Sequence, residues 1–459
     1  MLFAFGAAGG EALGIEKKPL NLRYKSHNPG GATLKIAVIG SGGREHTIVD
    51  KLAQSKRCGE IFVLPGNGGM ARQATCVPIK ATDVDAVVAW CADNAIDYVV
   101  VAPDDPLALG MVDALARRGI PAFGPDKAAA RIEASKVFAK DLMKRYNIPT
   151  AKWESFDAAG PAMDYIRTEG RYPVVVKADG LALGKGVLIC ENEAEAQAAI
   201  TGMMVDKQFG DSGSRVVVEE FLTGPEVSVL AFCDGETLAP MLSSMDHKRA
   251  LDGDKGLNTG GMGTVAPNPY YTDAMAARCM AEIFLPTVRA MQAEGAPFKG
   301  CLYFGLMLTA DGPRVIEYNC RFGDPETQVV LPLLQGDLLE IFMACTEGTL
   351  RPDMVAFAPG VAACVVMASG GYPGKYETGL PISGLDEAVA LPGTAVYHAG
   401  TKLEDGRLVT AGGRVLGVTA TAETLQKALD TAYEAVGRIH FEGAHWRRDI
   451  GQKALQAGG

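Results

Sequence analysis

Blocks of apolar residues alternate with polar, helix-like blocks along the first part of the chain. Leu34–Ile39, Ile61–Leu64 and Tyr98–Ala102 are short apolar runs, which are typical of buried strands. Helical patterns cover residues 83–94 and 107–118. Strands that alternate with helices predict a parallel sheet with helices on both faces.

Each of these strands is followed by a turn rich in glycine or proline. In the first turn, Gly40–His46, small residues let backbone N–H groups approach an anion at the start of the next helix. The dinucleotide-binding pattern requires a third glycine where this chain has Glu45, so an ordinary tight turn is the alternative. Because ligands bind at the carboxyl ends of such strands, we expect loops 40–46, 65–69 and 103–106 to line one pocket.

The next segment predicts a helix and then a hairpin with a lysine-bearing loop. Residues 126–146 have a helical pattern that contains Lys136, and two apolar runs then flank a loop of small residues with Lys177 and Lys185. Such a loop can close over a triphosphate, because N–H and ammonium groups neutralise the transferred phosphoryl group. It lacks the spacing and the Ser/Thr of a Walker A loop, so a loop without a ligand is the alternative.

Two further stretches carry candidate ligand contacts. Residues 215–222 predict a strand that ends in an acidic bend, which suits the adenine and ribose of a nucleotide or is simply a solvated strand end. Residues 243–268 contain Asp246–Arg249 and a glycine-rich segment, Asn258–Gly263, and are predicted to be irregular. Long irregular segments in compact domains are usually functional or disordered, and these residues favour an anion-binding loop.

The stretch Arg314–Glu326 predicts a metal site at the end of a strand. Glu317 and Asn319 are two residues apart, so both side chains leave the same face of the strand. A carboxylate and an amide oxygen suit Mg²⁺, which fills its other positions with water and phosphate oxygens. A strand ending in a polar turn is the alternative, but the turn carries three more charged residues: Arg321, Asp324 and Glu326.

The remaining patterns predict the rest of the architecture. We expect helices at 272–293, 337–347 and 421–437, a hairpin from 299 to 317, and a new unit of short strands from Val361 onward. Arg414 in that unit can border the active site, although a domain that packs only for stability is the alternative.

Length and composition restrict the class of protein. The 459 residues allow about three domains, and 48% hydrophobic and 21% charged residues are globular values. The net charge of -10 argues against a nucleic-acid or acidic-membrane partner. Ten cysteines without a Cys-x-x-Cys pair indicate a reduced, cytoplasmic protein, and no apolar run is long enough for a transmembrane helix. Residues 1–33 are a poor signal peptide, and we expect a disordered extension from an upstream start codon.

Nucleophilic and zinc chemistry find no support in the pattern. His46 and His247 have no Ser or Cys partner in a recognisable arrangement, and no His/Cys cluster has zinc spacing. The features converge on phosphoryl transfer.

Together these stretches resemble the ATP-grasp superfamily and, within it, the phosphoribosylamine–glycine ligase family. The resemblance runs from about Leu34 to the C-terminus. The segments that carry it are Gly40–His46, Lys177–Ala182, Gly184–Val187, Asp246–Arg249, Asn258–Gly263 and, most specific, Asn319–Gln328.

The resemblance implies an α/β protein with an ATP-grasp fold. A parallel-sheet N-terminal domain (34–134) would precede the ATP-grasp domain (135–330), with a flexible lid at about 155–225, and a small α+β C-terminal domain (361–459) would follow. It implies a monomeric cytoplasmic enzyme that ligates glycine to 5-phosphoribosylamine with ATP and Mg²⁺ or Mn²⁺, without nucleic-acid or membrane partners. The alternatives are another ATP-grasp carboxylate–amine or biotin-carboxylase-like ligase and a catalytically silent nucleotide-binding protein, although a silent protein is expected to have lost Glu317, Asn319 or the lysines.

Site residues follow from the resemblance by position. The metal ligands would be Glu317 and Asn319, and the catalytic residues Arg321, Asp246 and Lys185. The ATP contacts would be Lys136, Lys177, Gly180, Gly184, Lys185, Gly186, Glu219, Glu220, Leu222 and Glu226. The substrate contacts would be Gly40, Gly42, Gly43, Arg44, Glu45, Asn67, Asp104, Lys248, Asn258, Thr259, Gly260, Gly261, Asp324 and Glu326.

One position departs from the family pattern. The family commonly has Gly-Pro-Glu before a Pro-Leu pair, and this chain has Ala102-Pro103-Asp104-Asp105 there. The family's glutamate is expected to meet the hydroxyls of the ribosylamine. Asp104 is one methylene shorter, so its role, and whether Asp105 compensates, stays open.

Overall fold

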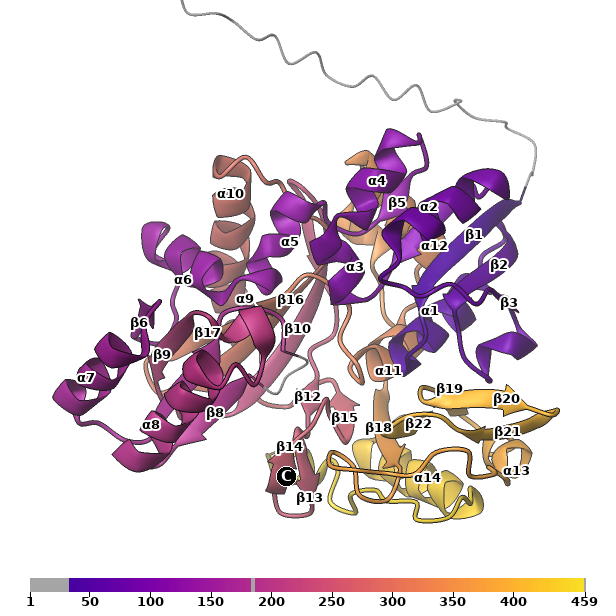
Figure 1. Ribbon diagram of the computed structural model, residues 1–459. Coiled ribbons are helices and arrows are strands. Elements are labelled where there is room, and N and C mark those ends of the chain that lie inside the picture. The colour runs from indigo at the N-terminus through magenta and orange to yellow at the C-terminus, as the bar shows by residue number, and fades with distance from the viewer. Residues whose placement is uncertain (1–32, 183–185, 458–459) are drawn as a thin grey trace, which may run out of the picture. The chain divides into compact units, whose positions relative to one another are not determined.

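The computed structural model describes residues 33–182 and 186–457 (Figure 1). Gly184, Lys185 and all of the predicted extension except Thr33 lie outside these residues. Within the described ranges, no helix is both long and apolar enough to cross a lipid bilayer.

The N-terminal sheet is parallel throughout, in the order β3-β2-β1-β4-β5, as predicted. Its strands are β1 (Leu34–Gly40), β2 (Cys58–Pro65), β3 (Thr75–Cys76), β4 (Tyr98–Val101) and β5 (Ala122–Phe123). Its helices are α1 (Gly43–Leu52), η1 (Met70–Arg72), α2 (Val84–Asp93), α3 (Asp104–Leu109) and α4 (Met111–Arg117). Successive side chains of β1 alternate between the two faces, so Ala37 and Ile39 pack with α2–α4, and Ile36 and Val38 pack with α1. Both faces of the sheet are therefore buried.

Two predicted helices are each divided in two. Gly110 has a φ of +90° and separates α3 from α4. The predicted helix 126–146 forms α5 (Lys127–Ala134) and α6 (Lys136–Arg145), because Ser135 is extended and its hydroxyl caps α6 by accepting the N–H of Phe138. The prediction of unbroken helices was wrong because capping and turn geometry at single residues outweigh the helical pattern.

A four-stranded antiparallel sheet, β11-β10-β16-β17, lies at the centre of the fold. Its strands are β10 (Glu226–Asp234), β11 (Leu238–Pro240), β16 (Lys299–Thr309) and β17 (Gly312–Asn319), and helices α9 (Asp273–Cys279), η4 (Met280–Phe284) and α10 (Leu285–Ala293) pack on it. The predicted hairpin 299–317 is confirmed. Gly305 pairs with Glu317 but Leu306 pairs with Val315, so Ile316 is an extra, bulged residue.

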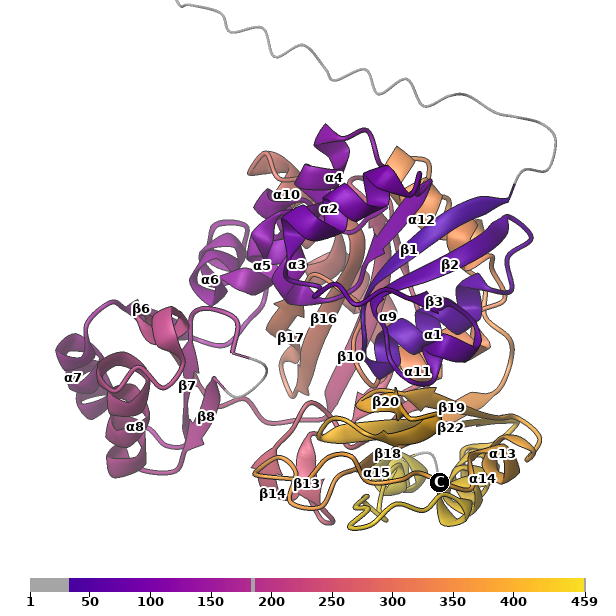
Figure 2. The same cartoon turned by 45° about the vertical axis from the view of Figure 1, so that its right-hand side comes forward.

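A second four-stranded sheet, β6-β9-β7-β8, lies beside α7 and α8 (Figure 2). It has its own small core. Its strands are β6 (Trp153–Phe156), β7 (Val174–Ala178), β8 (Val187–Cys190) and β9 (Val216–Glu220), accompanied by α7 (Ala159–Glu169), α8 (Glu193–Ile200), η2 (Thr201–Val205) and η3 (Gly210–Gly213). Val174 and Val176 of β7 pack against α7 and α8. The alternate residues Val175 and Lys177 therefore point away from this core, toward the cavity described below.

The third sheet joins segments that are distant in the sequence, in the order β12-β15-β18-β22-β19. Its strands are β12 (Met245–Asp246), β15 (Gly263–Ala266), β18 (Val361–Ala368), β19 (Thr394–His398) and β22 (Arg414–Ala422). Two hairpins, β13 (Arg249–Leu251) with β14 (Lys255–Asn258) and β20 (Thr401–Glu404) with β21 (Arg407–Thr410), and helices α13 (Leu385–Val389), α14 (Leu425–Arg438) and α15 (Gln452–Ala457) complete this part.

Residues 243–268 are thus not irregular, and that prediction was wrong. Strands of two to four residues are too short to show an alternation of apolar and polar residues. In addition, β15 forms by pairing with β18, about 100 residues further along the chain. The connection between the sheets consists of α11 (Thr327–Val330), η5 (Leu331–Leu333), α12 (Leu338–Glu347) and η6 (Pro352–Met354). Asp337 caps α12, in agreement with the predicted helix 337–347.

Candidate active site

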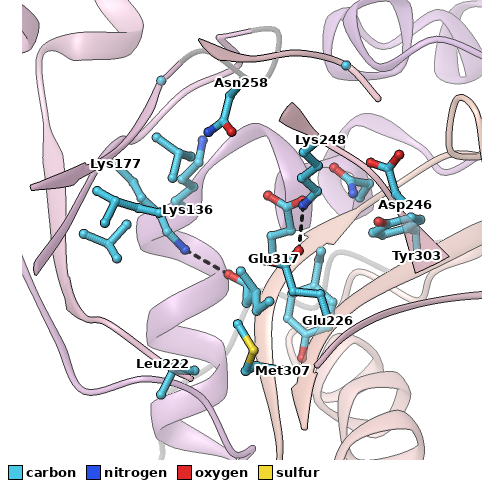
Figure 3. A pocket seen from close by; sticks show the side chains of 18 of the residues that line it. Lys136, Lys177, Leu222, Glu226, Asp246, Lys248, Asn258, Tyr303, Met307 and Glu317 are labelled. Carbon is cyan, nitrogen blue, oxygen red and sulfur yellow. Dashed lines mark hydrogen bonds and ion pairs between the residues drawn. The ribbon is translucent and has the colours of Figure 1, made fainter. Parts of the chain in front are cut away.

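A cavity of about 1080 Å³ is lined by both four-stranded sheets, by α6 and by loops of the N-terminal and C-terminal parts (Figure 3). The predicted site residues that line it are Arg44, Asp104, Lys136, Lys177, Gly186, Glu219, Glu220, Leu222, Glu226, Asp246, Lys248, Asn258, Thr259, Gly260, Glu317, Asn319, Arg321, Asp324 and Glu326. Residues from Arg44 to Glu326 thus meet in one place.

Glu317 and Asn319 leave the same face of β17, as the two-residue spacing predicted. Glu317 lies opposite Gly305, where an added Cβ would come within 3.0 Å of the Glu317 side chain. The Glu317 carboxylate lies 3.6 Å from Lys248. Burial disfavours its charge, but the neighbouring lysines outweigh this and lower the pKa of Glu317. Among the described residues, none forms a hydrogen bond with the side chain of Asn319.

A buried carboxylate holds two lysines at the base of the cavity. Glu219, 3% exposed, has Lys177 Nζ 2.9 Å from Oε1 and Lys140 Nζ 2.8 Å from Oε2. Lys177 also donates to the carbonyl of Ile316, the bulged residue of β17. Burial lowers the pKa of Lys140 to about 8 despite the Glu219 charge. Sequence reasoning missed Lys140, although it follows Lys136 by four residues and so shares its helix face.

Arg321 lies between two carboxylates from other segments. Its Nη2 lies 2.8 Å from Glu133 Oε1 and 3.6 Å from Asp104 Oδ2. Burial opposes ionisation of Asp104, but Arg321 and Arg44 lower its pKa. The Nε atom of Arg321 is buried and has no hydrogen-bond partner within the described part of the chain. Glu133 is a further residue that sequence reasoning missed, because nothing local distinguishes it from a helix-surface glutamate.

Asp324 connects three parts of the chain. Its carboxylate accepts a hydrogen bond from the backbone N–H of Arg44, and its carbonyl accepts one from Arg414 Nη1 at 2.7 Å. The same Nη1 atom donates to the carbonyl of Gly260 at 2.7 Å. Burial opposes ionisation of Asp324, but the charges of Arg414 and Arg44 outweigh this effect and lower the pKa of Asp324. Arg414 therefore borders the cavity, as one of its two interpretations proposed.

Asp246 and Glu326 are two neighbouring acidic side chains of the cavity. Burial and the nearby Glu326 carboxylate raise the pKa of Asp246. The Tyr303 hydroxyl donates to Glu326 Oε1 over 3.0 Å.

Lys248 lies between two other carboxylates, with its Nζ atom 3.6 Å from both Glu226 and Glu317. Figure 3 shows Lys248 beside Glu317, with Leu222 and Met307 together at another end of the cavity.

Several predicted site residues stabilise the surrounding loops instead of lining the cavity: Gly40, Gly42, Gly43, Glu45, Asn67, Gly180 and Gly261. Glu45 accepts the N–H of Gly42 and the Nε–H of Arg44, each over 2.5 Å. Gly180 contributes its carbonyl, which accepts from Lys136 Nζ at 3.1 Å. Gly261 has a φ of +114° and lies against Pro325 and Asp246.

The expectation that loop 65–69 lines the same pocket was wrong. The amide nitrogen of Asn67 donates to the carbonyls of Ser41 and His398, and its oxygen accepts the N–H groups of Gly69 and Met70. The loop is held against the C-terminal part of the protein, a contact that the sheet topology alone does not reveal.

Comparison with known proteins agrees with this arrangement. Residues 34–133, 134–327 and 362–453 match the N domain, the ATP-grasp (A) domain and the C domain of phosphoribosylglycinamide synthetase. A phosphoribosylamine–glycine ligase of Halalkalibacterium halodurans is 48% identical over 422 residues, which cover 92% of this chain and 97% of that protein. The trifunctional purine biosynthetic protein adenosine-3 of Gallus gallus is 47% identical over 92% of this chain and 42% of its own length.

Solved structures give the same result. The crystal structure of phosphoribosylamine–glycine ligase from Thermotoga maritima is 35% identical, has a TM-score of 0.80, and covers 91% of this chain and 100% of that one. The biotin carboxylase domain of 2-oxoglutarate carboxylase from Hydrogenobacter thermophilus shares the fold at 16% identity, with a TM-score of 0.70 over 94% and 95% of the two chains. The three family models and the coverage of these relatives show that the chain belongs to the phosphoribosylglycinamide synthetase family, whose central domain is an ATP-grasp domain.

Proposed function

We propose that this protein is an ATP-dependent carbon–nitrogen ligase that joins glycine to 5-phosphoribosylamine, giving glycinamide ribonucleotide, ADP and phosphate, the second step of de novo purine biosynthesis. The names of relatives at 48% identity support this activity. The observation that carries the proposal is the single cavity, in which Lys136, Lys177 and Glu317 of the ATP-grasp part face Arg44 and Asp104 of the N-terminal part. A nucleotide and a phosphorylated amine can therefore meet there.

ATP is assigned to the end of the cavity between the two four-stranded sheets. Leu222 and Met307 offer apolar surface to an adenine, and Glu226 suits the ribose hydroxyls. Lys136 and Lys177 supply ammonium groups for the phosphates. Glu219 holds Lys177 and Lys140 in place, so we assign it a positioning role. Gly184 and Lys185 keep the phosphate-contacting role that the family resemblance implies, although both lie outside the described residues.

Glu317 and Asn319 fit a hard divalent cation, Mg²⁺ or Mn²⁺. They offer an ionised carboxylate and an amide oxygen on one strand face, and the described residues contain no group of three or more His, Cys, Asp or Glu side chains that could hold a metal ion by themselves. This donor set suits an ion that takes one or two protein ligands and completes its shell with phosphate oxygens and water. When bound, the ion would neutralise charge on the transferred phosphoryl group.

The reaction follows from positioning and charge neutralisation. A carboxylate oxygen of glycine attacks the γ-phosphorus of ATP and ADP leaves, which forms glycyl phosphate. The amine nitrogen of phosphoribosylamine then attacks the acyl carbon, loses a proton and releases phosphate that carries the former glycine oxygen. Arg321, whose Nε–H has no hydrogen-bond partner among the described residues, suits stabilisation of the acyl phosphate, and Asp246 and Glu326 suit the ammonium group of glycine.

Isotope transfer tests this mechanism. Glycine labelled with ¹⁸O in both carboxylate oxygens is incubated with MgATP and phosphoribosylamine, and the phosphate and organic product are analysed by mass spectrometry. We expect one ¹⁸O atom in each phosphate and one ¹⁸O atom retained in the amide carbonyl of the product, glycinamide ribonucleotide. Unlabelled phosphate would contradict the acyl phosphate, and a requirement for another acid or amine would contradict the substrate assignment.

A further inference from the structure

The segment 445–453, which follows α14, runs beside the β13–β14 hairpin. Three hydrogen bonds, each between a backbone atom and a side chain, join this segment to the hairpin turn and to β13. They are Arg448 N to Asp252 Oδ1 (2.7 Å), Gly253 N to Asp449 Oδ2 (2.8 Å) and His445 Nε2 with Ala250 O (2.9 Å). The two segments lie about 195 positions apart in the sequence, so tertiary structure alone brings them together.

Arg447 is the centre of this contact. Its side chain is 1% exposed, and it donates two hydrogen bonds of 2.7 Å to Asp449, one of 2.9 Å to Asp254 and one of 3.2 Å to the carbonyl of Arg249. Asp254 also pairs with Lys453 of α15. The buried guanidinium of Arg447 forms hydrogen bonds with the carboxylates of both Asp449 and Asp254. Such an arrangement fixes the hairpin relative to segment 445–453 more than it stabilises the fold.

The position of the β13–β14 hairpin depends on its polar contacts with segment 445–453. It is a two-stranded sheet outside the larger sheets, and isolated two-stranded hairpins are at best marginally stable. Its two leucines contribute little apolar burial, because Leu251 is 49% and Leu257 67% exposed. Polar contacts to segment 445–453 therefore decide where the hairpin lies.

The base of the hairpin lines the cavity at Lys248, Asn258 and Thr259, and Asp254 in its turn lines the cavity as well. Thr259 donates its backbone N–H and its hydroxyl to the carbonyl of Lys248, at 2.8 and 2.9 Å, which closes the base of the hairpin. The Lys248 ammonium then lies 3.6 Å from Glu317 and from Glu226, the residues assigned to the metal and to the ATP ribose. A shift of the hairpin turn would displace Lys248, Asn258 and Thr259 together.

We propose that Arg447, acting through Asp254 and the β13–β14 hairpin, is a positioning residue that holds Lys248 in place for MgATP binding. The role of Lys248 in MgATP binding, in place of the substrate contact expected from the sequence, follows from its distance to Glu317 and Glu226 and so rests on their roles in the proposed function. Nucleotide binding can nevertheless be measured without the acid or the amine, so the two proposals can fail separately.

The test compares Arg447→Lys with Arg351→Lys, a control whose ion pair with Asp353 is exposed on both sides. Isothermal titration calorimetry gives the Kd for MgADP, steady-state kinetics give the KM values, and hydrogen–deuterium exchange reports on the amides of residues 249–259. For Arg447→Lys we expect a Kd for MgADP and a KM for MgATP raised about tenfold, a KM for phosphoribosylamine changed less than twofold, and faster exchange in the hairpin. The control should match the wild type.

Two outcomes would overturn the proposal: hairpin exchange equal to that of the wild type, or faster exchange with an unchanged Kd for MgADP. If Arg447→Lys does not fold, Asp449→Asn serves instead, since Asp449 does not line the cavity and accepts hydrogen bonds both from Arg447 and from the hairpin at Gly253 N. That variant should raise the Kd about threefold, and an unchanged Kd would equally contradict the proposal. A raised Kd for MgADP in the variants, together with a wild-type protein that does not turn over glycine, would support the positioning role and contradict the ligase assignment.

Discussion

Arg321 donates a hydrogen bond to Glu133, with 2.8 Å between Nη2 and Oε1, although the two residues are 188 positions apart. The other oxygen of Glu133 accepts the backbone N–H of Cys320 over 2.7 Å. The end of β17, where Glu317, Asn319 and Arg321 lie, is therefore fixed to α5 by one buried carboxylate.

Glu133→Gln should reduce kcat/KM at least tenfold. Glutamine keeps an acceptor for the Cys320 N–H but removes the charge that orients Arg321, and a buried charge without its partner is costly. Steady-state kinetics measure the loss, which corresponds to about 1.4 kcal/mol or more. Glu340→Gln, which alters an exposed pair with Arg57, is the control. Equal activity of the two variants would contradict the role of Glu133.

Asp104→Asn should raise the KM for phosphoribosylamine more than the KM for MgATP. Asp104 stands at the start of α3, beside Arg321 and near Arg44. Losing its charge alters the part of the cavity assigned to the amine substrate. Asp85→Asn, at an exposed position of α2, is the control. Equal changes in both KM values, or none, would remove Asp104 from the substrate site.

Protein stability should fall in mild acid because three histidines, His46, His247 and His398, are buried and neutral. The His46 ring accepts the backbone N–H of His398 over 2.8 Å, and burial lowers the pKa of His46 to about 3 and that of His398 to about 4. Below pH 6.5 the unfolded chain binds protons that the folded chain does not, so the free energy of unfolding decreases as the pH falls from 6.5 toward 4. For His398 the loss is at most on the order of 3 kcal/mol.

Urea unfolding between pH 4.5 and 8 measures this effect. His398→Gln should flatten the decrease, whereas His440→Gln, at an exposed position, should leave it unchanged. A wild-type free energy of unfolding that is constant between pH 6.5 and 4.5 would contradict the neutral burial of these histidines.

Gly261→Ala should reduce kcat/KM by more than tenfold. At a φ of +114°, an added Cβ would lie 2.5 Å from Pro325 Cδ and 2.7 Å from Asp246 Oδ1. The loop must then move away from the cavity. Gly437→Ala, within α14 and with no heavy atom within 4 Å of the added Cβ, should retain activity and gain up to about 1 kcal/mol in stability. Full activity of Gly261→Ala would show that the close approach is not needed.

Local patterns predicted the features that depend on neighbouring residues. The parallel strands, the hairpin 299–317 and the shared face of Glu317 and Asn319 follow from periodicity alone. Glu133, Lys140 and the contacts of Asn67 could not be predicted in the same way, because their partners come from segments fixed only by tertiary packing. The strands within 243–268 were missed for the same reason, since β15 is a strand because it pairs with the distant β18.

The most direct test of the account measures ADP release from MgATP, with glycine and freshly made phosphoribosylamine supplied together and each omitted in turn. We expect turnover only with both substrates, and none with Glu317→Gln, which should remain folded by circular dichroism. Turnover without glycine or without phosphoribosylamine, or full activity of Glu317→Gln, would contradict the account.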